Sequence, residues 1–182
     1  MMANFTIGHK ILESIEGGYV HDPLDRGGET LNGIARKFHP NWEGWAIVDA
    51  IKCAGSCDTK QLALKLASEE RLQSLVGAFY KKNFWDKMRL DEIESQVVAN
   101  NLYLFGVNAG IARAVKFAQQ IVGTRQDGML GAKTLAAINA TDEAHFKKAF
   151  DALEIAYYKG IVQRSPSQER FIKGWLRRAE LV

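Results

Sequence analysis

The chain has 182 residues, of which 47% are apolar and 25% charged, the composition of an ordinary globular protein with one sizeable core. Its formal net charge is only +3, so nothing indicates a basic arm for nucleic acid. No apolar run approaches the length of a transmembrane helix, and the first residues lack the basic and apolar regions of a signal peptide. We therefore expect synthesis in the cytoplasm and no stable membrane insertion.

The first predicted element is a helix over residues 5–16. Isoleucines recur every four residues from Ile7 onward, with Leu12 beside them, which gives the helix one apolar face. Gly17 and Gly18 then provide a stop signal. Glu16 is therefore expected to be the last residue of this helix, held on a packed scaffold.

The segment that follows, up to residue 34, is acidic and rich in glycine. Such a loop, with a short hairpin around its glycines, can bring Asp22, Asp25 and Thr30 back towards Glu16. A carboxyl group at a helix C-terminus feels the negative end of the helix dipole, which disfavours its charged form. A glutamate that keeps its proton near neutral pH is what general acid catalysis requires, so Glu16 is the candidate acid.

The rest of the chain is predicted to be helical, because apolar residues recur at helical spacing and no segment alternates like a strand. The fold class is therefore mostly α, with a small loop or β-hairpin after the first helix. Residues 41–59 are expected to be irregular, and V-N-A-G at 107–110 should interrupt or end a helix. The predicted helices cover residues 60–82, 92–106, 111–122, 132–139, 142–163 and 168–179.

The cysteines and histidines predict no metal site and no cofactor. Cys53 and Cys57 have C-x3-C spacing, which is neither a redox pair nor half of a zinc site. The four histidines form no metal-binding pattern. Two free thiols in a loop are favoured over a local disulfide.

Several motifs follow one another along the chain in a characteristic order. E-G-G-Y at 16–19 precedes D-P, D-x-G-G-E-T and N-G-I, and then come F-W-D at 84–86, L-F-G-V-N-A-G at 104–110, D-G-M-L-G-A-K-T-L at 127–135 and F-I-K-G-W-L-R-R at 171–178. Together they resemble glycoside hydrolase family 108, the phage- and prophage-type muramidases. The resemblance covers nearly the whole chain.

This resemblance implies a lysozyme-like helical fold and an enzyme that hydrolyses peptidoglycan. The bond cleaved would be the β-1,4 bond between N-acetylmuramic acid and N-acetylglucosamine. Residues 1–106 would form the lysozyme-like catalytic region and residues 107–182 a helical peptidoglycan-binding-type region, packed as one compact unit. No cofactor is implied.

The family resemblance assigns the catalytic glutamate to Glu16. A looser resemblance to the larger phage-lysozyme group, which has an Asp nine positions after its Glu and a Thr soon after, adds Asp25 and Thr30. Asp25 can equally be a turn residue, and Thr30 can equally cap a helix over 31–38. The nine-residue spacing also predicts the wider carboxyl separation of an inverting enzyme.

The candidate substrate-binding residues are Tyr19, Asn32 and Asn108. Tyr19 can stack on a sugar ring or pack against the first helix. Asn32 is displaced by one position from the family pattern, and Asn108 is favoured as a residue that satisfies buried polar groups beside the cleft. Glu29 is expected to brace the loop or lie at the surface rather than act as a second acid.

Two other functions remain open alongside the hydrolytic muramidase. A lytic transglycosylase would need only Glu16 and would leave an anhydro sugar, and a non-catalytic module would bind the wall without cleaving it. The expected partners are peptidoglycan glycan strands, with no nucleic acid. The enzyme would act on the cell wall, in the periplasm or outside the cell, after export through a holin or a secretion pathway.

Overall fold

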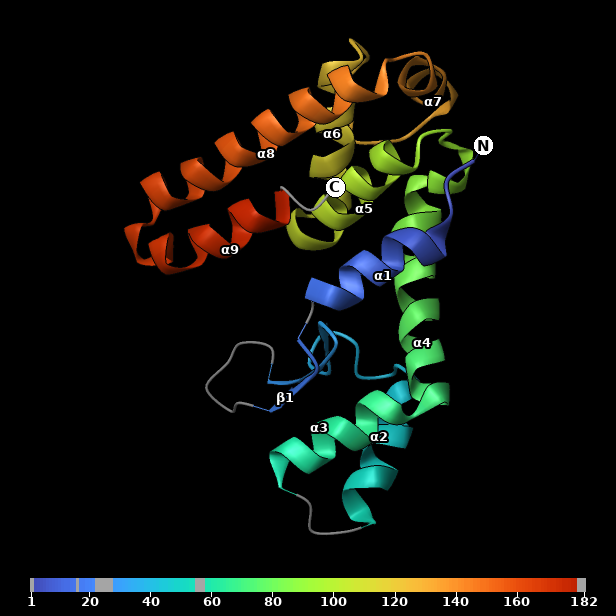
Figure 1. The fold of residues 1–182 in the computed structure, drawn as a ribbon, viewed down its shortest axis with the longest axis vertical. Coiled ribbons are helices and arrows are strands. Elements are labelled where there is room, and N and C mark those ends of the chain that lie inside the picture. Colours follow the sequence, from blue (N-terminus) through green and yellow to red (C-terminus); the bar gives the residue numbers. More distant parts are fainter. Residues whose placement is uncertain (1, 16, 22–27, 55–57, 180–182) are drawn as a thin grey trace. The chain divides into compact units, whose positions relative to one another are not determined.

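The computed structural model describes residues 2–15, 17–21, 28–54 and 58–179. They divide into two compact units. We call Leu12–Lys81 the sheet unit, and we call Met1–Ile11 together with Lys82–Val182 the helical unit. Figure 1 shows coiled ribbons along most of the chain and a small sheet after the first helix, which confirms the predicted mostly α fold class.

The sheet unit combines a three-stranded antiparallel sheet, in the order β1-β2-β3, with a group of helices that contact one another. α1 begins in the helical unit and ends in the sheet unit. In chain order the elements are α1 (Phe5–Ile15), β1 (Tyr19–His21), β2 (Glu29–Leu31), β3 (Ile34–Ala35), α2 (Gly44–Cys53), α3 (Thr59–Ser68) and α4 (Glu70–Tyr80).

The predicted hairpin at Gly33 is confirmed. β2 and β3 pair through Thr30 with Ala35, and the turn between the strands is Asn32-Gly33. Asn32 has a φ of 44° and Gly33 a φ of 80°, and an Asn-Gly pair accepts this left-handed backbone in tight hairpins. The other predicted turn includes Gly27, which lies outside the described residues.

The prediction that residues 41–59 are irregular is wrong, because most of that segment forms α2. Ile47, Val48 and Ile51 are β-branched and lower the local helix propensity, and the Glu43 side chain makes no capping hydrogen bond. Tertiary packing stabilises the helix instead, since Trp45 and Val48 are 4% and 0% exposed.

The single helix predicted over residues 60–82 is divided at Glu69, whose backbone is extended. Neither Gly nor Pro stands at this break, so the sequence carries no signal for it. The Gln73 side chain reaches back from α4 and donates a hydrogen bond to the Leu66 carbonyl oxygen at 2.9 Å. This bond satisfies one of the free carbonyl groups at the end of α3.

The helical unit contains the beginning of α1 and the whole C-terminal half of the chain. α5, α6 and α8 contact one another, and α9 packs along α8 (Figure 1). After a π-helical turn at Lys81–Trp85 its helices are α5 (Gln96–Ala109), α6 (Ile111–Ile121), α7 (Ala132–Asn139), α8 (Glu143–Arg164) and α9 (Glu169–Ala179).

Aromatic side chains form the core of the helical unit. Trp85 is 0% exposed, and its ring lies edge-on to that of Phe5 of α1, with 5.6 Å between the ring centroids. Phe105 of α5 contacts Phe117 of α6 at 5.1 Å and Phe150 of α8 at 5.7 Å. Such aromatic contacts lock three helices together.

The buried face of α1 includes Leu12, as predicted, but not Ile7. Ile7 is 49% exposed, whereas His9 and Leu12 are buried at 7% and 3% exposure. His9 stacks on Phe5 at 4.9 Å and its Nδ1 lies 3.1 Å from the Tyr103 hydroxyl. Packing against aromatic side chains therefore decides which side of α1 is buried.

The two glycine-rich segments predicted to break the helical half have structural roles. Gly110 has a φ of 94° and separates α5 from α6. The turn at 123–131 is clamped by the buried Gln119 side chain, which donates to Asp127 at 2.7 Å and accepts from the Gly128 backbone at 2.9 Å. The predicted division of function at residues 106 and 107 stays a prediction.

Candidate active site

Two of the predicted catalytic residues, Glu16 and Asp25, lie outside the described residues. The structure does describe both neighbouring elements, since α1 ends at Ile15 and β1 begins at Tyr19. The position of Glu16 in the chain is thus between a packed helix and the first strand of the sheet.

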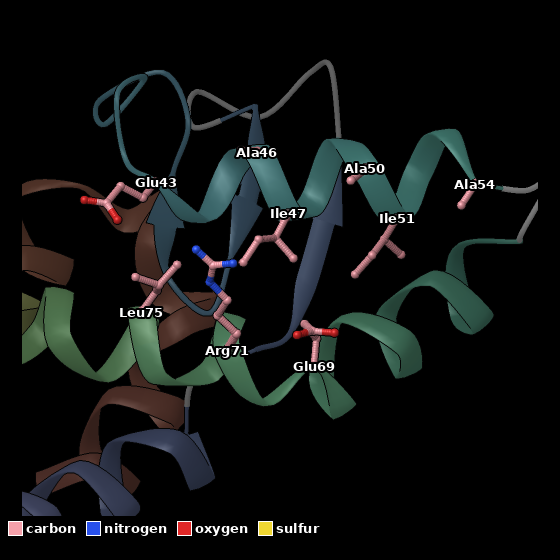
Figure 2. Close-up of a pocket in the computed structure, with 9 residues that line it drawn as sticks. All are labelled: Glu43, Ala46, Ile47, Ala50, Ile51, Ala54, Glu69, Arg71 and Leu75. Atoms are coloured by element: carbon pink, nitrogen blue, oxygen red, sulfur yellow. The ribbon is translucent and has the colours of Figure 1, made fainter.

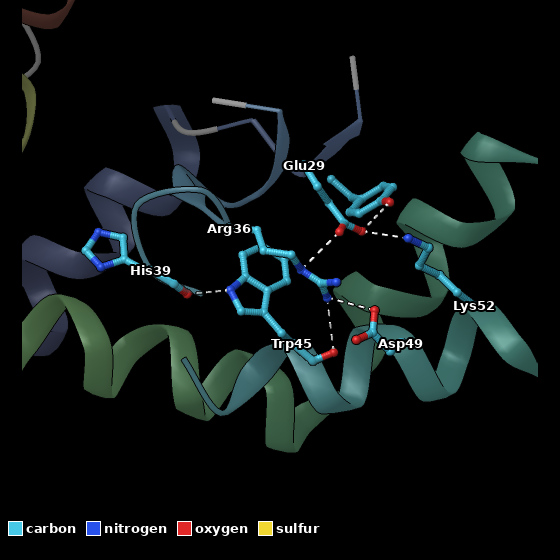
Figure 3. Close-up of polar contacts among 7 residues, drawn as sticks. Glu29, Arg36, His39, Trp45, Asp49 and Lys52 are labelled. Atoms are coloured by element: carbon cyan, nitrogen blue, oxygen red, sulfur yellow. Dashed lines mark hydrogen bonds and ion pairs between the residues drawn. The ribbon is translucent and has the colours of Figure 1, made fainter. Parts of the chain in front are cut away.

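The best-defined polar cluster in the sheet unit surrounds Glu29, which is 8% exposed (Figure 3). Its Oε1 accepts hydrogen bonds from the Tyr19 hydroxyl at 2.7 Å and from Lys52 Nζ at 2.8 Å. Its Oε2 lies 3.0 Å from Arg36 Nε, and Arg36 also pairs with Asp49 at 2.7 Å. One carboxylate therefore ties β1, β2, α2 and the residue after β3 together.

The charges around Glu29 keep it ionised. Burial alone would raise its pKa, but the hydrogen bonds from Lys52 and Tyr19 and the charge of Arg36 lower the pKa of Glu29 below its usual value. Burial and the adjacent carboxylate raise the pKa of Tyr19, so its hydroxyl keeps the proton that it donates. Glu29 therefore braces the sheet, as predicted, and is unsuited to deliver a proton.

Tyr19 and Thr30 are brought into the same sheet but onto opposite faces. Tyr19 shares a face with Glu29 and Leu31 and is 7% exposed. Thr30 pairs with Val20, which is 48% exposed, and faces the other side. The helix-capping alternative for Thr30 is wrong, because Thr30 is the middle residue of β2.

Asn32 anchors the β2–β3 turn to α4. Its side-chain amide donates to Gln73 Oε1 at 3.0 Å, its carbonyl oxygen accepts from the Tyr80 hydroxyl at 2.7 Å, and its backbone N–H donates to the Gly18 carbonyl oxygen at 3.1 Å. The last bond links the turn to the glycine pair that follows Glu16 in the chain.

Asn108 belongs to the helical unit and is linked through a tyrosine hydroxyl to a second buried carboxyl group. Its side-chain amide donates to the Tyr158 hydroxyl at 2.6 Å, and that hydroxyl donates to Glu154 Oε1 at 3.0 Å. Glu154 is 6% exposed. Burial raises the pKa of Glu154 to about 7, with a further contribution from Asp151.

Sequence reasoning did not find Arg36, Asp49 and Lys52, the charged partners around Glu29. Asp49 and Lys52 belong to α2, the helix that the sequence did not predict. Without that helix nothing in the sequence indicates that a lysine 23 positions away reaches Glu29. Local sequence patterns identify the acidic loop but not the cations that pair with Glu29.

Among the residues that the structure describes, no group of three or more His, Cys, Asp or Glu side chains could hold a metal ion. No described helix is both long and apolar enough to cross a membrane.

The chain is similar to known proteins over nearly its whole length. Residues 9–110 match the family model for Glycosyl hydrolase 108, and residues 113–180 match the model named Predicted Peptidoglycan domain. The structure of SagA from Brucella abortus has a TM-score of 0.68 and 29% sequence identity, over 97% of this chain and 89% of that chain. No curated protein matches the sequence.

A mostly helical fold, with a small sheet after its first helix and a peptidoglycan-domain match in its C-terminal part, defines a glycoside hydrolase directed at peptidoglycan. The matched segment 9–110 is more than half of the 182 residues. The chain therefore belongs to the glycosyl hydrolase 108 family. The predicted class of enzyme, a peptidoglycan hydrolase, is confirmed.

Replacement of Glu29 by Gln should destabilise the protein at neutral pH, because it leaves Lys52 and Arg36 beside an uncharged amide. We expect a loss of about 1–3 kcal/mol at pH 7 in urea unfolding. The folded-state pKa of Glu29 is lowered, so the wild-type advantage exists above the unfolded pKa and disappears as the pH falls through the folded pKa. Asp49→Asn, at a 51% exposed partner of Arg36, is the control and should cost less than about 1 kcal/mol. Equal stability of Glu29→Gln and wild type at pH 7 would refute this role.

Glu154 should make stability fall as the pH rises from the acidic range to neutral. Its folded pKa of about 7 lies above the ordinary value of 4.5, so the folded state binds the proton more tightly and the free energy of unfolding falls between these two values. The decrease should be about 3 kcal/mol. Glu154→Gln should abolish it, whereas Glu169→Gln on exposed α9 should leave it in place. An identical pH profile for wild type and Glu154→Gln would show that Glu154 is ionised in the fold.

Proposed function

We propose that this enzyme hydrolyses the β-1,4 bond between N-acetylmuramic acid and N-acetylglucosamine, with Glu16 as the general acid. The observation that carries the proposal is the family match over residues 9–110, which includes E-G-G-Y at 16–19. Cleavage of a glycosidic bond needs a proton for the leaving oxygen and a group that stabilises or attacks the cationic sugar. Glu16 would supply the proton.

The described elements around Glu16 support this role. α1 ends at Ile15, so the negative end of its dipole is directed at the position that follows, and a negative potential favours a protonated carboxyl. Three residues after Glu16, Tyr19 is fixed by the Glu29 cluster. Catalytic groups need this kind of support, because small misplacements are costly in rate.

Asp25 is proposed as the second carboxylate and Thr30 as the hydroxyl that orients a water molecule. Thr30 lies on the face of the sheet opposite Glu29, which separates the ion-pair cluster from the proposed chemistry. A hydroxyl on a paired strand has a defined position, as a water-orienting group requires. Inversion at the anomeric carbon then follows from the water-mediated mechanism.

Tyr19, Asn32 and Asn108 are proposed to support the substrate site rather than to form its walls. The hydroxyl of Tyr19 is held by Glu29, and the amide of Asn32 is held by Gln73. Asn108 is held by Tyr158 within the helical unit. Residues 113–180, which match a peptidoglycan domain, would bind the wall. The enzyme would reach the wall through a holin or a secretion pathway.

Glu16→Gln should remove the transferable proton while it preserves the shape of the side chain. We expect the release of soluble fragments from purified sacculi to fall at least roughly 10²-fold, with an unchanged melting temperature. Glu70→Gln, the same substitution at an exposed position in the sheet unit, is the control and should retain full activity. A folded Glu16→Gln protein that lyses sacculi at the wild-type rate would disprove the assignment.

Asp25→Asn and Thr30→Val should each reduce turnover with little effect on stability. Valine retains the β-branched shape that suits the middle of β2 and removes only the hydroxyl, so a lower kcat with an unchanged unfolding midpoint would point to the water-orienting role. Thr30→Ser restores a hydroxyl and should recover part of the activity. If Asp25→Asn is fully active, Asp25 is a turn residue and Asp22 becomes the candidate partner.

A further inference from the structure

A groove in the sheet unit lies between α2 and α4, away from the contacts around Glu29. Its volume is about 470 Å³, within the range of about 300–1,000 Å³ that is usual for small-ligand sites. Figure 2 shows the two helices running antiparallel, with Arg71 extending from α4 towards α2 across the groove.

The floor of the groove is apolar because α2 carries two stripes of apolar residues at helical spacing. Ala46 and Ala50 form one stripe, and Ile47 and Ile51 form the other, with Leu75 opposite on α4. None of these side chains is fully buried. A different side of α2 contributes Asp49 and Lys52 to the Glu29 cluster, so the groove is not part of that cluster.

Three charged side chains line this groove, and each is unpaired among the described residues. Arg71 extends across it, with Glu43 near one end and Glu69 near the other (Figure 2). None of the three makes a side-chain hydrogen bond or ion pair with another described residue. A guanidinium that has no partner among the described residues, and that lies over an apolar floor, is suited to bind a carboxylate.

This pattern of charge selects among ligands. A polyanion would be repelled by Glu43 and Glu69, and a fatty acid would place its apolar chain beside a carboxylate. An uncharged sugar would leave all three charges without partners. The groove fits a short chain that carries small apolar side chains, a carboxylate and an ammonium group.

We propose that the groove between α2 and α4 binds the peptide portion of peptidoglycan, with Arg71 on a peptide carboxylate. The stem peptides of the wall join alanine methyl groups to free carboxylates and to the ammonium group of a diamino acid. The methyl groups would contact Ile47 and Ile51, and Glu69 or Glu43 would receive the ammonium group. This inference rests on the proposed function, because the groove meets stem peptides only if the enzyme acts on peptidoglycan. It predicts that the enzyme prefers glycan strands that carry peptides.

The first test is direct binding of the synthetic tripeptide L-Ala-γ-D-Glu-meso-diaminopimelate, measured by calorimetry on the full chain. Arg71→Met should weaken binding at least about tenfold, the usual effect of losing a charge-assisted hydrogen bond. Lys60→Met removes an exposed cation from neighbouring α3 and should leave the affinity unchanged. No binding to wild type, or equal binding by the two variants, would overturn the proposal.

The second test compares cleavage of peptide-bearing sacculi with cleavage of glycan strands stripped of peptides by an amidase. The ratio of the two rates should exceed one for wild type and for Lys60→Met, and should fall several-fold in Arg71→Met. An unchanged ratio in Arg71→Met would overturn the peptide site and leave the proposed function intact. No cleavage of either substrate by wild type would refute the proposed function itself. Sedimentation would show whether the protein dimerises at working concentrations. A dimer that occludes the groove would also count against peptide binding.

Discussion

The buried carboxylate of Glu29 is the interaction on which the sheet unit depends. Strands of two or three residues have too few ladder hydrogen bonds to be stable alone. Glu29 compensates by joining β1 through Tyr19, α2 through Lys52, and the chain after β3 through Arg36. An ion pair in such a place is costly to break, because each partner would be left partly buried without its counter-charge.

The Glu29 contacts also explain how the glycine-rich segment after α1 can belong to the proposed active site. Gly17 and Gly18 allow the backbone after α1 to adopt many conformations, because glycine has no strong preference for one of them. The two ends of the segment are nevertheless fixed, by the packed residue Leu12 in α1 and by Tyr19 in β1. The turn at Asn32 adds a hydrogen bond from its backbone to the Gly18 carbonyl oxygen. The glycine pair that follows Glu16 in the chain is thus held between two well-defined elements.

The helical unit is stabilised differently, mainly through aromatic packing, with ion pairs such as Arg89–Glu92 and Lys147–Asp151 around it. Phe105, Phe146 and Phe150 are almost completely buried, and Asn108 connects α5 to α8 through Tyr158. Burial of Glu154 favours its protonated form near neutral pH. Glu29 and Glu154 therefore change the pH dependence of stability in opposite directions, because Glu29 stabilises as an anion and Glu154 as a neutral acid.

Helical periodicity predicted α5 to α9 closely, together with breaker residues such as Gly110. It failed at α2, where β-branched residues lower the helix propensity and tertiary contacts stabilise the helix. It also failed at Glu69, where no breaker residue marks the end of α3. The acidic loop was visible in the sequence, but the partners of Glu29 were not, because they come from α2 and from beyond β3. Distant pairing of this kind has no local sequence signal.

The most direct test of the proposed hydrolysis is the chemistry of the new chain ends. Soluble fragments released from purified sacculi would be reduced with borohydride and analysed by liquid chromatography and mass spectrometry. The proposed mechanism predicts fragments that end in reduced N-acetylmuramic acid and that contain the added water. Fragments that end in anhydro-N-acetylmuramic acid, or in reduced N-acetylglucosamine, would contradict it.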